Sequence, residues 1–196
     1  MSELNKTLED VFGYTSFRPG QEEVINHLMQ KKKLLAVMPT GAGKSLCYQL
    51  PALLFENQTI VVSPLVALMD DQVIGLKDLG VNAERVHSGM PESKRTQIWE
   101  KFKNKQIKIL YISPESLMRD ELLNALKLLS ISMFVVDEAH CISKWGSDFR
   151  REYELLKELQ NHFPEAIISA FTATADEETR ADINNKLTNG EGKIFQ

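Results

Sequence analysis

The chain has 196 residues, of which 43% are hydrophobic and 26% charged, with a formal net charge of −4 and a pI of about 5.6. This length and apolar content predict one domain around one core, and the acidic balance excludes a general basic field for nucleic acid, although backbone amides and a few arginines can still hold phosphates. The two cysteines are far apart and match no disulfide framework or zinc motif, and no apolar run approaches the ~20 residues that span a bilayer. We therefore expect a cytoplasmic protein, or a nuclear one in a eukaryote, without a membrane segment.

Short apolar runs recur between helical patterns along the chain. Predicted strands are 34–38, 59–63, 83–88, 108–113, 133–137 and 167–173. Predicted helices, with apolar residues three and four apart, are 92–104, 114–129, 151–163 and 176–187. Pro64 and Pro114 each follow a strand that ends in serine, which predicts a serine-capped helix start at both places.

This alternation predicts the fold class. Near-continuous apolar strands that alternate with helices are typical of an α/β domain with a mainly parallel sheet and helices on both faces. Ligands bind such sheets at the carboxyl ends of the strands, so the residues that follow each strand are the candidate functional residues.

The segment MPTGAGKS follows the first predicted strand and precedes a helical pattern. Gly41 and Gly43 can turn backbone N–H groups toward phosphate oxygens at the positive end of that helix. Lys44 would reach the β- and γ-phosphates of a nucleotide, and the Ser45 hydroxyl would ligate Mg²⁺.

Two features depart from a simple phosphate loop. The strict pattern has a glycine where this chain has Met38, so the motif alone also allows a tight turn with a solvated lysine. After the loop, LCYQLPALL carries a helical pattern for two turns, which we expect Pro51 to perturb.

The segment MFVVDEAH places two adjacent carboxylates at the end of another buried strand. Such a pair is costly unless a cation meets it, and Mg²⁺ held by Asp137 through water would supply that cation. Glu138 would then orient or deprotonate the water that attacks the γ-phosphate. An acidic helix start with a capping aspartate is the alternative, and His140 alone is more often a packing or capping residue.

Six segments in this order resemble the first motor domain of superfamily two helicases, and more closely that of RecQ family DNA helicases. They are FGYTSFRPGQ (12–21), MPTGAGKS (38–45), VVSPLVALMDDQV (61–73), YISPES (111–116), VVDEAHCISKWGSDFRREY (135–153) and AFTATA (170–175). Helicases of this superfamily commonly lack the first glycine of the strict loop. The resemblance implies a RecA-like P-loop domain, ATP and Mg²⁺ as cofactors, and 3′ to 5′ translocation on single-stranded DNA driven by ATP hydrolysis.

The resemblance also implies roles for individual residues. The catalytic residues implied are Lys44, Asp137, Glu138 and His140, with Ser45 and Asp137 as metal ligands. The nucleotide-binding residues implied are Tyr14, Arg18, Gln21, Thr40, Gly41, Ala42, Gly43, Lys44 and Ser45, among which Gln21 would contact the adenine edge and Tyr14 would stack on the base. A capped turn that packs Phe12 and Phe17 into the core is an alternative role for residues 12–21, and both roles can hold.

Four residues are implied in DNA binding: Ser63, Trp145, Phe149 and Arg150. Ser63 and the first amides of the next helix would hold a backbone phosphate without a basic side chain, although an ordinary capped helix is the alternative. The aromatic rings would stack on bases and report single strand to Glu138, although core aromatics are the alternative. Residues 172–174, TAT, would link hydrolysis to the DNA path through hydroxyl contacts to His140 or the acid pair.

The chain departs from the RecQ pattern at three positions of the aromatic segment, CISKWGSDFRREY (141–153). The family usually has glutamine, histidine and proline where this chain has Lys144, Ser147 and Arg151. Ser147 keeps hydrogen-bonding capacity but loses a longer, chargeable side chain. Lys144 and Arg151 add positive charge near the implied DNA path.

In this family a second motor domain, a zinc-binding region and a winged helix follow the first domain. We interpret residues 1–196 as the N-terminal ATP-binding domain alone, and expect its ATP binding to be weak and its hydrolysis slow without arginines from the second domain. The expected partners are single-stranded and tailed duplex DNA and that second domain. An RNA helicase motor and a nucleotide-dependent binding module without turnover remain alternatives.

Overall fold

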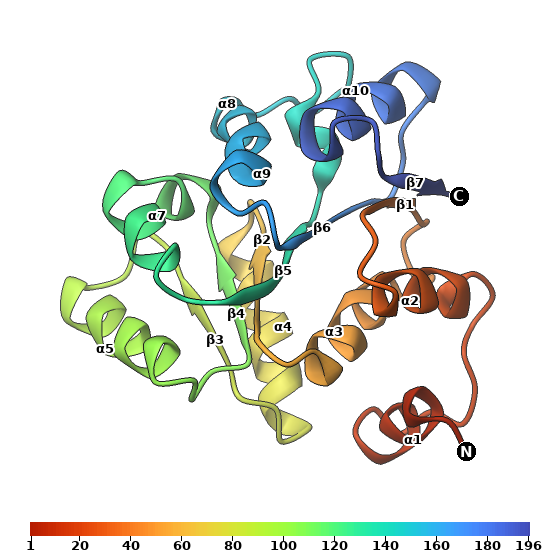
Figure 1. Cartoon of the computed structure of the whole chain (residues 1–196), viewed down its shortest axis with the longest axis horizontal. Helices are drawn as coiled ribbons and strands as arrows, with labels where there is room; N and C mark the ends of the chain where they lie inside the picture. The colour runs from red at the N-terminus through yellow and green to blue at the C-terminus, as the bar shows by residue number, and fades with distance from the viewer.

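A computed structural model describes residues 1–196 and contains one sheet of seven strands, all paired in parallel, in the order β3-β4-β2-β5-β6-β1-β7 (Figure 1). The strands are β1 Leu34–Val37, β2 Gln58–Val62, β3 Ala83–Val86, β4 Ile109–Ile112, β5 Ile131–Val136, β6 Ile167–Thr172 and β7 Lys193–Phe195. The predicted α/β class with a parallel sheet is confirmed, and the six predicted strands are present.

Ten α-helices and two short 3₁₀ helices connect the strands. The helices are α1 Glu3–Asp10, α2 Gln21–Met29, α3 Lys44–Leu54, α4 Val66–Asp78, α5 Glu92–Lys103, α6 Pro114–Leu117, α7 Asp120–Leu126, η1 Ala139–Ile142, α8 Arg151–Glu154, η2 Leu155–Glu158, α9 Leu159–His162 and α10 Glu177–Thr188. No helix has both the length and the apolar content needed to cross a membrane.

The core is divided by the sheet into two apolar layers. Alternate residues of each strand face opposite sides, so Leu34 and Ala36 join one layer and Leu35 joins the other. Helices α1 to α4 pack on the first layer, and α5 to α10 pack on the second. Figure 1 shows α2 and α3 across the sheet from α7, α8 and α9. Helices therefore cover both faces, as predicted.

The direction of each crossover explains which face its helix covers. The connections β1 to β2 and β2 to β3 run toward one edge of the sheet and carry α3 and α4. Every later connection runs toward the opposite edge and carries the helices from α5 onward. Since crossovers between parallel strands are right-handed, reversing the direction reverses the face. The reversal leaves β1 beside β6, and β6 beside β5.

Two predicted helices are interrupted. The predicted helix at 114–129 is divided into α6 and α7 by extended backbone at Arg119. The predicted helix at 151–163 is divided into α8, η2 and α9, and its buried residues Tyr153, Leu156 and Leu159 are three apart. That spacing suits a 3₁₀ turn, in which residues three apart lie on the same line.

Two proline predictions were wrong. Helix α3 continues through Pro51 to Leu54, and Leu50 and Ala52 beside the proline are fully buried. Core packing at this turn therefore outweighs one missing N–H bond. At Pro64 no serine caps a helix, because Ser63 still pairs with β4 through its N–H, 3.1 Å from the Ile112 carbonyl, and α4 begins later.

The prediction at Pro114 is only partly confirmed. Pro114 is the first residue of α6, and Ser113 occupies the cap position. The Ser113 hydroxyl donates to Ser116 Oγ at 2.8 Å and makes no capping bond to a backbone N–H.

Candidate nucleotide and nucleic-acid site

The three neighbouring strands β5, β6 and β1 end at one edge of the sheet, and each is followed by a predicted functional segment. The glycine loop (residues 38–45) follows β1, the acid pair (Asp137 and Glu138) follows β5, and Thr172 ends β6. Because the strands are parallel and adjacent, these segments meet at their carboxyl ends, where ligands bind such sheets.

The glycine loop joins β1 to the N-terminus of α3. Gly43 precedes the helix with φ of 78°, a conformation in which a side chain is strained, and a Cβ there would displace the Gln21 side-chain amide. Glycine at residue 43 therefore suits both the backbone and the position of Gln21. Met38 keeps a negative φ, packs in the core with 6% exposure, and donates its N–H to the Thr172 carbonyl at 2.9 Å. The loop does not need a glycine at that position.

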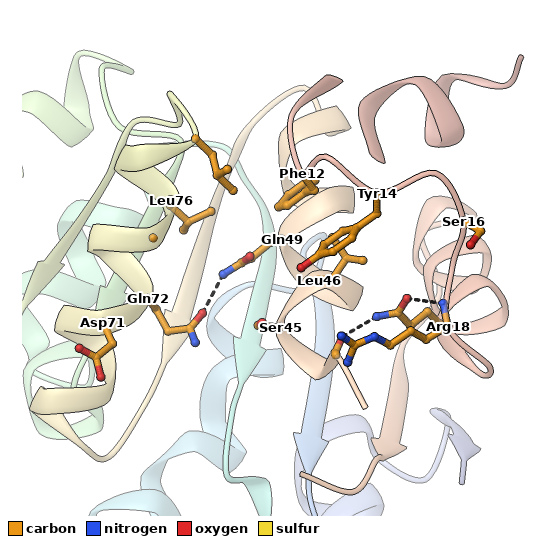
Figure 2. Close-up of a pocket in the computed structure, with 14 residues that line it drawn as sticks. Phe12, Tyr14, Ser16, Arg18, Ser45, Leu46, Gln49, Asp71, Gln72 and Leu76 are labelled. Atoms are coloured by element: carbon orange, nitrogen blue, oxygen red, sulfur yellow. Dashed lines mark hydrogen bonds between the residues drawn. The ribbon is translucent and has the colours of Figure 1, made fainter. Parts of the chain in front are cut away.

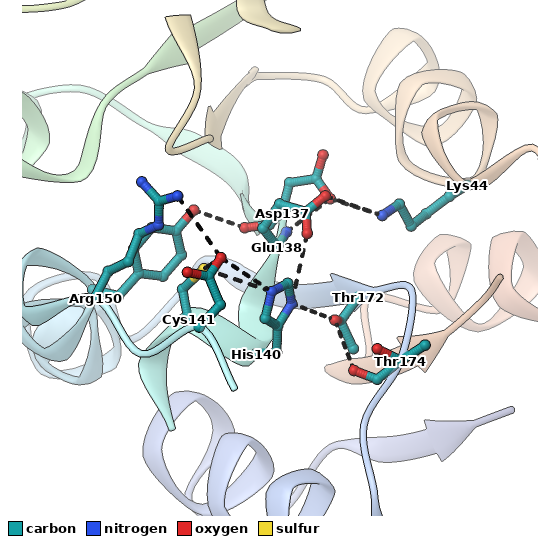
Figure 3. A network of polar contacts seen from close by, with 10 residues as sticks. Lys44, Asp137, Glu138, His140, Cys141, Arg150, Thr172 and Thr174 are labelled. Atoms are coloured by element: carbon teal, nitrogen blue, oxygen red, sulfur yellow. Dashed lines mark hydrogen bonds and ion pairs between the residues drawn. The ribbon is translucent and has the colours of Figure 1, made fainter. Parts of the chain in front are cut away.

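Lys44 faces both carboxylates of the acid pair (Figure 3). Its Nζ lies 3.4 Å from Asp137 Oδ1 and 3.7 Å from Glu138 Oε1. Burial raises the pKa of Asp137, and the Lys44 ammonium opposes that shift. An ionised carboxylate at 7% exposure with one cationic neighbour is suited to a hard divalent cation.

Glu138 has a strained backbone. Its φ of 51° and ψ of 43° are left-handed, a conformation uncommon for a residue with a side chain, and its N–H donates to Asp137 Oδ1 at 2.9 Å. Tyr153 supports the same turn, since its buried hydroxyl donates to the Asp137 carbonyl at 2.9 Å. Such strain persists only where surrounding contacts hold it, and it is concentrated at functional sites.

His140 connects the acid pair to the end of β6, as Figure 3 shows. Its Nδ1 lies 2.7 Å from Thr172 Oγ1 and 3.6 Å from Glu138 Oε2. The Thr172 hydroxyl in turn lies 3.3 Å from the Thr174 carbonyl, to which it donates. The structure thus brings residues 172–174 together with His140 through a hydroxyl, one of the contacts expected from the sequence.

The other imidazole nitrogen faces residues to which the sequence interpretation gave no role. His140 Nε2 lies 3.7 Å from Asp148 Oδ2 and 3.8 Å from Cys141 Sγ. Asp148 Oδ2 also lies 3.7 Å from an Arg150 guanidinium nitrogen. Asp148, Cys141 and Tyr153 all lie in the segment 135–153 that the motifs had already identified, and this was the available signal.

The two predicted aromatic rings differ in exposure: Trp145 is exposed to solvent and Phe149 is half-buried. Trp145 is 69% exposed, which rules out the alternative that it is a core aromatic. Phe149 is half-buried, with Lys144 Nζ 5.7 Å from its ring centre, and Arg150 is half-buried beside it. An exposed tryptophan on a short loop is a surface on which a planar ligand can stack.

A pocket of about 450 Å³ lies between residues 12–21, α3 and α4, and Figure 2 shows part of its lining. Gln21 is 2% exposed; its Nε2 donates to the Gly43 carbonyl at 3.0 Å and its Oε1 accepts from the Arg18 N–H at 2.8 Å. Arg18 also donates to the Gly41 carbonyl at 2.6 Å. Tyr14 is 52% exposed at the pocket. Arg18 and Gln21 therefore hold the glycine loop from the side.

The core-packing role expected for residues 12–21 is also present. Phe12 and Phe17 are partly buried and pack on the apolar layer of α1 to α4. The segment therefore anchors its aromatic residues in the core and presents Tyr14 to the pocket.

Ser63 is deeply buried at the end of β2. It is 2% exposed, and its hydroxyl has no hydrogen-bond partner. Leu65 and Val66, which follow Pro64, are exposed at the start of α4. A buried polar atom without a partner is uncommon in folded proteins, so Ser63 retains an unused donor and acceptor beside a helix N-terminus.

A buried polar chain joins α3 to α4 behind the pocket. Tyr48 Oη and Tyr111 Oη lie 3.2 Å apart, and Gln49 Nε2 donates to Tyr111 Oη at 3.0 Å and to Gln72 Oε1 at 2.9 Å. Burial raises the pKa of Tyr111 to about 12, so both tyrosines are neutral hydrogen-bonding groups near pH 7. Figure 2 shows the bond between Gln49 and Gln72.

We expect Tyr111→Phe to lower the free energy of unfolding by about 1–3 kcal/mol, because it leaves the buried Tyr48 hydroxyl without a partner. Urea denaturation followed by circular dichroism measures this change. The matched control is Tyr14→Phe at an exposed ring, which should stay within about 0.5 kcal/mol of the parent. Equal stability of both variants would show that the buried chain contributes nothing.

Comparison with known proteins places this site in a family. Residues 18–183 match the DEAD/DEAH box helicase family. The chain is 48% identical over 180 residues to "ATP-dependent DNA helicase RecQ" of Haemophilus influenzae, covering 92% of this chain and 29% of that protein. It is 43% identical over 188 residues to "Probable ATP-dependent DNA helicase RecS" of Bacillus subtilis, covering 95% of this chain and 38% of that protein.

Among solved structures, one titled as a hypothetical ATP-dependent RNA helicase from Sulfolobus tokodaii has a TM-score of 0.75 at 22% identity, covering 100% of this chain and 57% of that chain. At that identity the likeness concerns the fold, which is the RecA-like fold predicted. The chain therefore belongs to the DEAD/DEAH box helicase family. Within it, the chain is similar to RecQ helicases, as the motifs indicated, and it spans about a third of the curated relatives it matches.

Proposed function

We propose that this domain is the ATP-hydrolysing motor of a DNA helicase of RecQ type. The observation that carries the proposal is the position of Lys44 Nζ, which lies 3.4 Å from Asp137 and 3.7 Å from Glu138 at the carboxyl ends of neighbouring strands. The backbone amides from Thr40 to Ser45 and the N-terminus of α3 would hold the nucleotide phosphates, with Ala42 within that loop. Tyr14, Arg18 and Gln21 would hold the base beside them.

The side chains here fit Mg²⁺. Ser45 and Asp137 would hold it as oxygen ligands, and the bound ion would neutralise charge on the β- and γ-phosphates. Lys44 would contact the same phosphates from the glycine loop. The buried Asp137 carboxylate, with its raised pKa, is most readily kept ionised when such cations are near.

In this proposal Glu138 orients the attacking water and accepts its proton. Its carboxylate lies beside the same Lys44 ammonium as that of Asp137, at 3.7 Å against 3.4 Å, and in this proposal the two carboxylates have separate tasks. His140 acts as a positioning residue, because its Nδ1 lies 2.7 Å from Thr172 Oγ1 and 3.6 Å from Glu138 Oε2 and so contacts both residues. A movement at the end of β6 would reach the hydrolysis site through that imidazole.

Single-stranded DNA would cross the same edge of the sheet. Trp145 and Phe149 would stack on bases, and Arg150 and the amides after Ser63 would contact phosphates. The Asp148 carboxylate, 3.7 Å from both His140 and Arg150, would couple base stacking to hydrolysis. Local contacts of this kind explain how an acidic domain can bind DNA.

The proposal extends to the larger protein. A second motor domain would supply arginines that complete the ATP site. Without them, this domain alone would hydrolyse ATP more slowly than the complete motor, by a factor of about 10³ or more. The whole motor would translocate 3′ to 5′ inside the cell and act on single-stranded and tailed duplex DNA.

The test compares ATP hydrolysis by the chain with single-stranded DNA and with single-stranded RNA of the same sequence. We expect stimulation by DNA, and Trp145→Ala should remove most of it, since stacking contributes about 1–3 kcal/mol per base. The conservative control Trp145→Phe keeps an aromatic face and should retain most of the stimulation. Stimulation by RNA alone would favour an RNA helicase, and stimulation untouched by Trp145→Ala would remove the aromatic segment from the mechanism.

A further inference from the structure

Three different metal-binding atoms meet on the side of His140 that faces away from the acid pair. His140 Nε2 lies 3.8 Å from Cys141 Sγ and 3.7 Å from Asp148 Oδ2, and the thiol sulfur lies 3.8 Å from the same carboxylate oxygen. Around a tetrahedral zinc ion with bonds of about 2.0–2.3 Å, ligand atoms are about 3.3–3.6 Å apart. The three atoms therefore nearly form one face of such a tetrahedron.

The hydrogen bonds around His140 leave the correct nitrogen free for a metal. In the tautomer with the imidazole proton on Nδ1, His140 Nδ1–H donates to the Thr172 hydroxyl oxygen at 2.7 Å, and that hydroxyl donates to the Thr174 carbonyl at 3.3 Å. The lone pair on Nε2 then points toward Cys141 and Asp148. Metal-binding histidines are commonly fixed in this way, by a hydrogen bond from the nitrogen that does not bind the metal.

The three side chains differ in exposure in a way that admits an ion. Cys141 is fully buried, the His140 side chain is 18% exposed, and the Asp148 side chain is 54% exposed. A cavity of about 480 Å³ borders His140, Trp145 and Ser147. That cavity borders neither Cys141 nor Asp148, so a cation would approach past the exposed Asp148 carboxylate, with a water as its fourth ligand.

Two neighbouring features oppose a bound cation. Arg150 lies 3.7 Å from Asp148 Oδ2, but the carboxylate has a second oxygen that can keep that ion pair. Burial raises the pKa of Cys141 to about 12, so the thiol is protonated near pH 7 and metal binding must release its proton. Both features lower the affinity, whereas the sulfur ligand of Cys141 favours a thiophilic ion over Mg²⁺.

We propose that His140, Cys141 and Asp148 form a site for a borderline-soft divalent cation such as Zn²⁺, separate from the magnesium site. The ion would join the acid-pair turn to the aromatic segment, because Asp148 lies in that segment and His140 contacts Glu138. A consequence, which rests on the proposed function, is that the bound ion holds the aromatic segment in place and inhibits DNA-stimulated hydrolysis.

The binding test uses Co²⁺ alone, added to the 196-residue chain under anaerobic conditions with a non-chelating reductant. We expect thiolate-to-cobalt charge-transfer absorption at one ion per chain, displaced by Zn²⁺ and unaffected by excess Mg²⁺. Cys141→Ala should lose the band, and the matched variant Cys47→Ala, at the other buried thiol, should keep it. The proposal is overturned if the parent shows no band, if Cys141→Ala retains it, or if Cys47→Ala loses it.

A surface variant keeps the test valid if Cys141→Ala does not fold. Asp148→Asn changes an exposed side chain and should weaken Co²⁺ binding at least tenfold, whereas Asp10→Asn on α1 should not. Unchanged binding in Asp148→Asn would overturn the ligand assignment. In the activity test, Zn²⁺ should inhibit DNA-stimulated hydrolysis by the parent chain and by Cys47→Ala, and should spare Cys141→Ala. Cobalt binding without inhibition would contradict the consequence for hydrolysis, while inhibition without the band would contradict the site.

Discussion

The Lys44→Ala variant is expected to lose ATP hydrolysis by a factor of about 10² to 10³, because a cationic group that meets the γ-phosphate stabilises the charge that develops there. Its affinity for nucleotide should fall as well, since Lys44 would contact the phosphates in the ground state too. Hydrolysis is measured under single-turnover conditions with excess chain, and affinity with a fluorescent ATP analogue. A binding module without turnover would show no DNA-stimulated hydrolysis for the substitution to remove.

Two controls separate the chemistry from the fold. Lys77→Ala removes a lysine whose only ion pair is an exposed one with Glu84 at 2.9 Å, and its hydrolysis should equal that of the parent. Lys44→Arg keeps a cation beside the buried Asp137 carboxylate, so it should keep the melting temperature that Lys44→Ala loses. Hydrolysis by Lys44→Ala at the rate of the parent would contradict the role of this lysine.

The strand positions were predictable because the sheet is buried on both faces. Residues such as those of β2 and β5 are almost all buried, so the sequence has continuous apolar runs there. β7 was missed because its three residues are mostly exposed and pair only with β1. α1 was missed because Leu8 is its only buried residue, so its apolar pattern is short. α2 was missed although Val24, Ile25 and Leu28 have helical spacing, because the segment is only nine residues long.

The candidate site was predictable in its parts and not in its connections. Strand ends and the glycine motif identify Lys44 and Asp137, but the separation of their side chains depends on β6 lying between β1 and β5, which no local pattern specifies. The contact between His140 and Thr172 joins residues 32 positions apart in the sequence. The left-handed conformation of Glu138 was unpredictable because glutamate rarely adopts it without tertiary constraint.

Glu138→Gln should separate nucleotide binding from hydrolysis more cleanly than any other substitution in the site. The amide has nearly the same shape as the carboxylate but cannot accept the proton of the attacking water, so hydrolysis should fall by a factor of about 10² to 10⁴. Nucleotide affinity should remain within about threefold of the parent, because the Lys44 contact with Asp137 at 3.4 Å is independent of Glu138.

Glu154→Gln is the matched control for this prediction. Glu154 also faces a lysine at 3.7 Å, as Glu138 does, but its partner is Lys144 in the aromatic segment. The same change of a carboxylate to an amide there should leave the slow hydrolysis without DNA unaltered. If Glu138→Gln and Glu154→Gln hydrolyse ATP equally well, then Glu138 does not accept the proton. If Glu138→Gln instead loses nucleotide affinity in proportion to hydrolysis, the residue contributes to ground-state binding and the water must be activated elsewhere.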